Sequence, residues 1–284
     1  MTSILVGIDG STRGERALAW AARRAVRDGA TLTLLTVIDP RAARESGATE
    51  QVAYTAAHNL LKAVTRELAV AFPQIEATTR IATGGIVDAV VDAAEGHDLI
   101  VLGSHHGASL RETVGGAKGL RVSVSTTVPT VVVPVDWDAD RPGSGIVVGV
   151  GPDQVSENAI AFGVGEALAT GERLELVSAW GLPPLLSRPA EAMGGGLAPV
   201  GVEFQSRLDE RVRLLHDAHP GLDVRGRAVE AASPAAGIVA AARGHRLLVL
   251  GTHSRTVLGR ALFGSVTHGV LLELDTPTVV VPQP

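Results

Sequence analysis

The chain has 284 residues, of which 45% are hydrophobic and 19% charged, with a net charge of −5 and no cysteine. This composition excludes a disulfide framework and a cysteine-ligated metal, and its weak acidity argues against nucleic acid as the main partner. Aromatic residues make up only 3%, so platforms for base stacking are not expected. No apolar run reaches membrane-spanning length, and Asp9 comes too early for a signal peptide. We therefore expect a cytoplasmic protein with no membrane partner.

The first half alternates strand-like and helix-like segments. Residues 3–8 form a continuous apolar run, typical of a strand buried on both faces of a parallel sheet. Residues 13–28 follow with helical spacing, and Ser11 or Thr12 can cap that helix. Further strands are predicted at residues 31–38, 75–83, 98–102 and 130–133. Further helices are predicted at residues 50–71, 86–95 and 110–125, and a loop at 39–48.

The second half repeats this plan after a polar linker. Residues 136–144 (DWDADRPGS) lack any period and separate a domain over 1–135 from one over 145–284. Strands are predicted at residues 146–150, 174–180, 222–229, 246–250 and 278–281. Helices are predicted at 157–169, 202–219, 234–243 and 258–274, with a loop rich in proline and glycine at 181–199. The alternation predicts an α/β fold with a parallel sheet in each half.

The two halves are copies of one another. The stretch 99–134 begins LIVLGSHHG and returns at 247–282 as LLVLGTHSR, and both copies close on Pro-Thr-Val-Val-Val-Pro. One constant offset relates Gly103 to Gly251, His105 to His253, Gly116 to Gly264 and Pro129 to Pro277. An ungapped repeat of this length indicates an internal duplication.

Each half resembles a universal stress protein domain, and the whole chain resembles the tandem type of actinobacteria. The resemblance rests on VGIDGS at 6–11, DLIVLGSH at 98–105 and the closing PTVVVP. It implies two tandem, doubly wound, parallel five-stranded sheets in the order 3-2-1-4-5, of the adenine nucleotide alpha hydrolase-like type and unrelated to α/β hydrolases. It also implies that some members bind ATP.

The nucleotide-binding branch of the family carries a Gly, two residues, a second Gly, nine residues, then Gly followed by Ser or Thr. The first glycine lets backbone amides approach phosphate, and the last pair opens a helix with free amides. An acidic residue after the first strand takes the nucleoside end. The first half keeps Asp9, Gly103 and Gly116. It departs from the pattern at His106 and Ala117.

The second half departs from the pattern at other positions. It keeps Gly251 and the pair Gly264-Ser265, but Ser254 replaces the second glycine. Gly151 stands where the first half has its acid. The first half is therefore better suited to the nucleoside end of a nucleotide, and the second half to the phosphate end.

The resemblance implies an adenine nucleotide as ligand, namely ATP, alone or with Mg²⁺. Val37 matches the position on the second strand that lies against adenine in the family, and Ala179 is its smaller counterpart. No catalytic or metal-binding residue is predicted. The predicted nucleotide-binding residues are Asp9, Ser11, Val37, Gly103, His106, Gly116, Ala117, Lys118, Gly251, Ser254, Gly264, Ser265, Val266 and Thr267.

Several of these residues have a second, structural interpretation. Asp9 can instead cap a helix, and Gly103 and Gly251 can simply end strands and allow close helix packing. His106 either blocks phosphate or donates to it. The nearby cations are either phosphate ligands or solvated helix charges: Arg111, Lys118, Arg255 and Arg260.

Two classes of function follow from this reading. The first is an ATP-binding stress-response regulator that acts through nucleotide-dependent conformation and contacts with an unidentified regulatory protein. The second is a scaffold of the same fold that binds no nucleotide. A slow ATPase is a weaker third, because no general base or magnesium ligand is evident near the loops, so no enzyme is expected.

The closing valine strands are expected to be apolar sheet edges, which proteins rarely leave uncovered. Residues 130–133 are therefore predicted to pair with residues 278–281 within one chain. The sequence leaves open whether the protein also forms a homodimer, through its helices or through residues 181–199.

Overall fold

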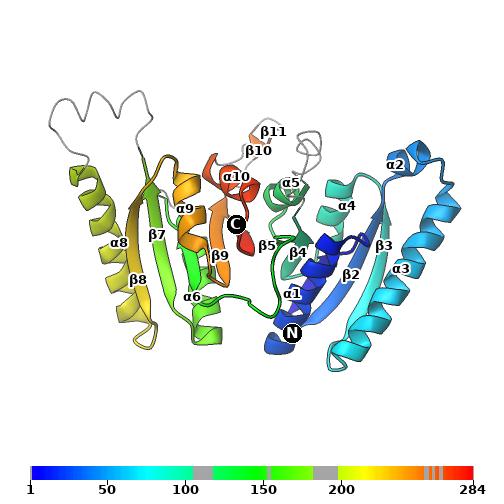
Figure 1. Cartoon of the computed structure of the whole chain (residues 1–284), viewed down its shortest axis with the longest axis horizontal. Coiled ribbons are helices and arrows are strands. Elements are labelled where there is room, and N and C mark those ends of the chain that lie inside the picture. Colours follow the sequence, from blue (N-terminus) through cyan, green and yellow to red (C-terminus); the bar gives the residue numbers. More distant parts are fainter. Residues whose placement is uncertain are drawn as a thin grey trace. The chain divides into compact units, whose positions relative to one another are not determined.

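A computed structural model describes residues 2–104, 118–151, 155–181, 198–252, 256–257, 260–261 and 265–283. The chain divides into two compact units, Met1–Asp140 and Arg141–Pro284. Within each unit, helices lie against five parallel strands (Figure 1).

The first unit has its strands in the order β3-β2-β1-β4-β5, and every neighbouring pair is parallel. The strands are β1 (Ser3–Gly7), β2 (Thr31–Ile38), β3 (Ala77–Thr83), β4 (Leu99–Gly103) and β5 (Thr130–Val133). The helices are α1 (Thr12–Asp28), α2 (Pro40–Glu45), α3 (Glu50–Ala71), α4 (Ile86–Ala93) and α5 (Lys118–Ser125). The predicted sheet order is confirmed.

The second unit repeats this order as β12-β9-β6-β7-β8. Its strands are β6 (Ile146–Gly149), β7 (Leu174–Trp180), β8 (Val224–Glu230), β9 (Leu247–Thr252) and β12 (Thr278–Pro282). Its helices are α6 (Val155–Thr170), α8 (Ala198–Ala218), α9 (Pro234–Ala242) and α10 (Ser265–Leu272). The helix predicted at 258–274 is wrong at its start, because β10 (Thr256–Val257) pairs antiparallel with β11 (Arg260–Ala261).

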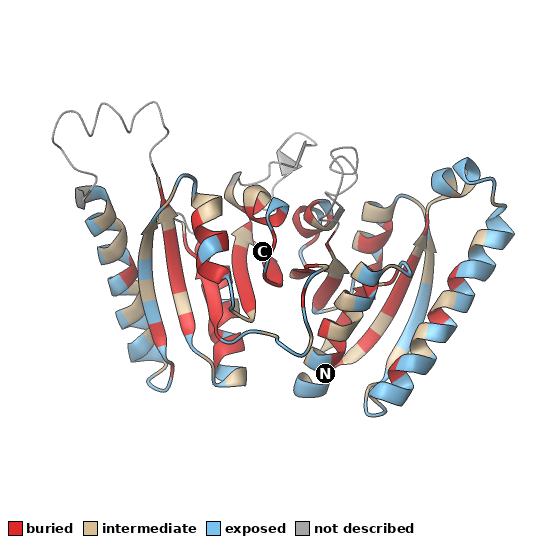
Figure 2. Cartoon of the chain, viewed as in Figure 1, coloured by how far each residue is buried: buried red, intermediate tan, exposed pale blue. Residues whose placement is uncertain are grey.

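Strand β1 illustrates why the apolar runs become central strands. Ile4, Leu5 and Val6 are fully buried, because helices cover both faces of the sheet. On one face Leu5 packs with Val90 of α4 and Val122 of α5. On the other face α1 lies against β1 and β4. Figure 2 shows the consequence, with buried residues along the central strands and exposed residues on the outer sides of the helices.

The loop predicted at residues 39–48 is wrong, because α2 forms there. The Asp39 side chain accepts a hydrogen bond from the Arg41 amide at 2.9 Å and so caps the helix. Pro40 occupies the first helical position, where its missing N–H breaks no hydrogen bond.

Parts of two further predictions lie outside the described residues. These are residues 110–117 of the helix predicted at 110–125 and residues 182–197 of the loop predicted at 181–199. The pairing predicted between residues 130–133 and 278–281 stays a prediction. Among the helices that the structure describes, none is both long and apolar enough to cross a bilayer.

Candidate ligand-binding site

The turn after β1 fixes a carboxylate at the carboxyl edge of the first unit's sheet. Asp9 Oδ1 accepts hydrogen bonds from the Ser11 amide at 3.0 Å and from the Ser11 hydroxyl at 2.5 Å. The same hydroxyl accepts from the Gly14 amide at 3.3 Å, so Ser11, not Asp9, caps α1. Asp9 is exposed, and within the described residues its second oxygen accepts no hydrogen bond. A free acceptor is therefore held in a fixed direction.

Two glycines are required where α1 begins. A Cβ on Gly14 would stand 2.8 Å from Asp9 Oδ1, so any side chain there would displace the carboxylate. A Cβ on Gly103 would collide with the backbone carbonyl of Arg13. The first turn of α1 therefore lies directly against the end of β4, and the structural interpretation of Gly103 is sufficient to explain this glycine.

A cavity of about 230 Å³ opens at this junction. Its lining comes from β1, β2 and β4, from the start of α1, and from α4 and α5. Val37, Ile86, Val90 and Leu102 form an apolar wall. The volume is below the roughly 300–1,000 Å³ of pockets that enclose whole drug-sized ligands, so it suits one flat group of a larger molecule.

Polar groups lie around that apolar wall. Asp9 lines the cavity from the turn after β1, and Arg13 lines it from the first turn of α1. In the part of the chain that the structure describes, Arg13 has no ion-pair partner, and it is half-buried. Thr36 Oγ1 donates to the Ile8 carbonyl at 2.9 Å, so this hydroxyl braces β2 against β1. The cavity thus offers one carboxylate, one guanidinium and an apolar surface.

The predicted residues of the first half come together only in part. Asp9, Val37 and Gly103 line this one cavity, and Ser11 orients Asp9. Lys118 begins α5, next to Gly119 of the lining. The remaining predicted residues of this half lie outside the described residues: His106, Gly116 and Ala117.

In the second half, the described predicted residues join β9 to α10. The Thr267 hydroxyl donates to the Gly251 carbonyl at 3.2 Å, so it ties the helix to the end of the strand. Val266 packs against the apolar core of this unit. Ser265 begins α10, and two predicted residues lie outside the described residues: Ser254 and Gly264.

The second half also changes the turn after its first strand. Gly151 takes the place of Asp9, and Ser156 takes the place of Gly14. The Gly151 amide donates to Ser156 Oγ at 2.8 Å, and Ser156 is buried. A buried hydroxyl therefore satisfies the Gly151 amide, and these two positions offer no acid to a ligand.

Sequence reasoning missed Arg13, Thr36 and Ile86 as lining residues. Arg13 follows the cap by two residues, where an arginine is usually part of a solvated helix face. Arg13 lies beside Gly103 because of the way α1 packs on β4, and the local sequence pattern does not reveal this packing. The one available signal was Gly14, because a glycine in the first turn of a helix indicates close approach of other groups.

The chain thus consists of two α/β units in tandem. The cavity of the first unit lies at the carboxyl ends of its strands, the edge at which parallel α/β sheets bind ligands. The sequence profile described as "Universal stress protein family" matches residues 1–134 and 145–282. The chain therefore belongs to the universal stress protein family.

Relatives of similar length support this membership. A universal stress protein of Mycolicibacterium smegmatis is 26% identical, over 98% of this chain and 96% of that protein. One of Mycobacterium tuberculosis is 27% identical, over 99% of this chain and 97% of that protein. The crystal structure of a universal stress protein from Archaeoglobus fulgidus shares the fold, with a TM-score of 0.74 at 15% identity, over 99% of this chain and 96% of that one.

Proposed function

We propose that the first unit binds an adenine nucleotide, ATP above all, and that the protein acts as a nucleotide-responsive regulator under stress. The observation that carries the proposal is that Asp9, Val37 and Gly103 line one cavity. Membership of a family in which some proteins bind ATP adds to it.

The chemistry of the cavity fits the parts of a nucleotide. The apolar wall that includes Val37 suits the base. The second oxygen of Asp9 can accept from a ribose hydroxyl. The guanidinium of Arg13 can pair with a phosphate, because its planar fork matches phosphate oxygens. Mg²⁺ would reach such a site with the phosphates, since the described residues contain no group of three His, Asp or Glu side chains that could hold a metal.

A scaffold that binds no nucleotide is the competing function. One observation favours it, because the backbone of Arg13 alone accounts for Gly103. In a scaffold, the cavity would be a packing defect beside α1 and would show no preference for nucleotides.

Calorimetric titration of the full chain with ATP and Mg²⁺ separates the two functions, preceded by nucleotide analysis of the purified protein. Asp9→Asn should weaken ATP about tenfold, since it removes a charged acceptor. Asp138→Asn is the matched control, because Asp138 also accepts from an amide two residues on, at 2.9 Å, but lies outside the cavity lining. No uptake of ATP would favour the scaffold, whereas equal affinity in both variants would show that Asp9 does not contact the nucleotide.

A further inference from the structure

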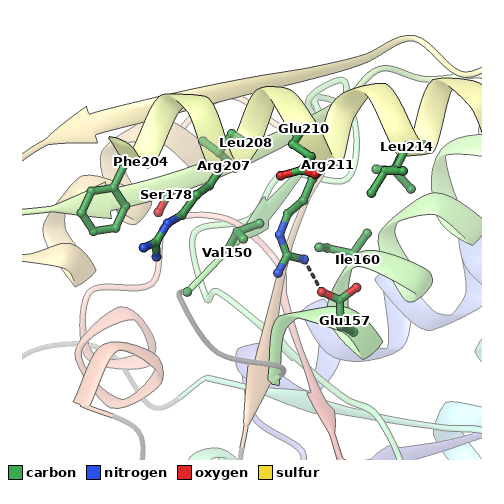
Figure 3. Close-up of a pocket in the computed structure, with 12 residues that line it drawn as sticks. Val150, Glu157, Ile160, Ser178, Phe204, Arg207, Leu208, Glu210, Arg211 and Leu214 are labelled. Atoms are coloured by element: carbon green, nitrogen blue, oxygen red, sulfur yellow. Dashed lines mark hydrogen bonds and ion pairs between the residues drawn. The ribbon is translucent and has the colours of Figure 1, made fainter. Parts of the chain in front are cut away.

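A second cavity, of about 490 Å³, lies in the second unit between α6, α8 and the carboxyl end of β6 (Figure 3). Its floor is apolar, and Val150, Ile160 and Leu208 are each more than nine-tenths buried. Phe204 of its lining stacks on Trp180, with ring centroids 6.2 Å apart. The volume falls within the roughly 300–1,000 Å³ of small-molecule pockets.

Two arginines of α8 line the same cavity. Arg211 forms an ion pair with Glu157 of α6, so the pair bridges the two helices (Figure 3). Arg207, one turn earlier, pairs with Glu203, with 2.5 Å between Nη2 and Oε1. The Arg211 side chain is 27% exposed and that of Glu157 is 57% exposed. Glu157 is therefore the partner that water can more readily solvate.

The internal duplication shows what stands at these positions in the first unit. Leu61 of α3 and Leu208 of α8 are both buried, and each precedes the next strand of its unit by the same number of residues. In this register Arg207 corresponds to Leu60. The Leu60 side chain covers the turn at Gly10, where an added Cβ would meet its Cδ1 at 3.4 Å. The position of Leu60, which covers this turn in the first unit, is thus occupied by Arg207 in the second unit.

The same register aligns Arg211 with Val64. Arg211 lies on the helix stripe that Phe204, Leu208 and Leu215 also occupy, and all four line the cavity. Glu157 and Glu203 neutralise the two guanidinium groups, and Glu157 and Glu210 also line the cavity. Because the paired glutamates are 57% and 65% exposed, water can solvate them, and an anion that buries an aliphatic body can take their place beside the arginines.

We propose that this cavity binds a small organic anion with an aliphatic body, either a carboxylate or a phosphate monoester. The acid group pairs with Arg211 in place of Glu157, and Arg207 lies one turn away. The aliphatic body lies on Val150 and Ile160. Arginine suits both acids, because its fork presents two parallel N–H donors.

This site is independent of nucleotide binding by the first unit. The first unit's cavity extends from its β1 turn toward α4 and β4, whereas this one extends along α6 and α8. A failure of either proposal therefore leaves the other untouched.

Calorimetric titration of the full chain with four ten-carbon probes tests the charge preference. Decanoate and decyl phosphate represent the two acids, and the tighter of them identifies the acid group. Decan-1-ol should bind about tenfold more weakly, and decylammonium should not bind. Failure of both acids to bind, or equal binding of decan-1-ol, overturns the proposal.

Three variants locate the site. Arg211→Val installs the residue of the first unit and should weaken the preferred acid about tenfold. Glu157→Gln releases Arg211 and should strengthen binding. Arg225→Val is the control, since Arg225 and its partner Asp223 lie outside the lining and the Arg225 side chain is 65% exposed. Unchanged binding by Arg211→Val, with an unchanged melting temperature, refutes the assignment, and ATP titration of each variant should match that of the wild type.

Discussion

The Ser11 hydroxyl donates a 2.5 Å hydrogen bond to Asp9 Oδ1 and at the same time accepts one from the Gly14 amide at 3.3 Å. One oxygen atom therefore couples the start of α1 to the direction of the carboxylate. The helix cap and the candidate ligand group form a single unit, so their contributions to stability and to binding can be separated only by comparison with another cap.

Ser11→Ala should lower both stability and nucleotide affinity. Loss of the cap should lower the free energy of unfolding by about 1 kcal/mol. Release of the Asp9 carboxylate should weaken ATP about threefold to tenfold, because the acceptor is no longer held in one direction. Denaturant unfolding and calorimetry measure the two effects.

Thr49→Ala supplies the comparison for that variant. Thr49 caps α3 by accepting from the Val52 amide at 3.3 Å, as Ser11 does for α1. It should lower stability by a similar amount and leave ATP affinity unchanged. If both variants weaken ATP equally, the role of Ser11 is that of a cap alone.

Gly103→Ala should destabilise the first unit, because the new Cβ would collide with the Arg13 carbonyl and push the first turn of α1 away from β4. We expect a loss of about 1–3 kcal/mol, the usual range for overpacking. Gly165→Ala should do the opposite: this glycine lies exposed inside α6 with nothing within 4 Å of its Cβ position, and alanine favours helix by about 1 kcal/mol. Thermal unfolding of both variants checks the contrast.

Asp223 should make stability depend on pH in a defined direction. The hydrogen bond from Arg173, 2.9 Å from Nε to Oδ2, lowers the pKa of Asp223 below its ordinary 3.8. A carboxylate with a lowered pKa stabilises the fold above its unfolded-state pKa, and that contribution is lost as the pH falls through the folded-state pKa. Asp223→Asn should therefore melt below the wild type at neutral pH, and the gap should close below pH 3.8.

Arg173→Met tests the cause of that pH dependence. Without the guanidinium the pKa of Asp223 should rise, which carboxyl chemical shifts in an NMR titration would report. A pKa that stays low in this variant would assign the effect to Arg225 or His216, whose charges also lower it.

The fold was largely predictable because its signals are local. Buried parallel strands need continuous apolar runs such as residues 3–8, and the duplication doubled each signal. The short helix α2 was missed because Asp39-Pro40 also suits a turn. Residues 260–261 were placed in a helix because a two-residue strand leaves no period to detect.

The candidate site was predictable only where it follows a motif. Asp9, Val37 and Gly103 follow the family pattern and line one cavity. Arg13 entered the lining through packing of α1 on β4, which is a tertiary event. The sequence pattern does not single out Arg211, because its place over the floor of the second cavity depends on how α8 is rotated about its axis.

Arg13→Gln should separate the two ends of the nucleotide. The guanidinium lines the cavity and has no ion-pair partner among the described residues, so its removal should weaken ATP about tenfold through loss of a phosphate contact. Adenosine should bind with unchanged affinity, since it carries no phosphate. Calorimetry with ATP, AMP and adenosine measures how the loss grows with charge.

Arg23→Gln controls for net charge in that experiment. Arg23 lies on the same helix and pairs with Asp140 at 3.5 Å, outside the cavity lining. Because long-range attraction of ATP falls equally in both variants, only a direct contact makes the Arg13 variant weaker than this control. An equal loss in both would show that Arg13 acts through the general field of the protein, and a loss shared by adenosine would place Arg13 at the nucleoside end instead.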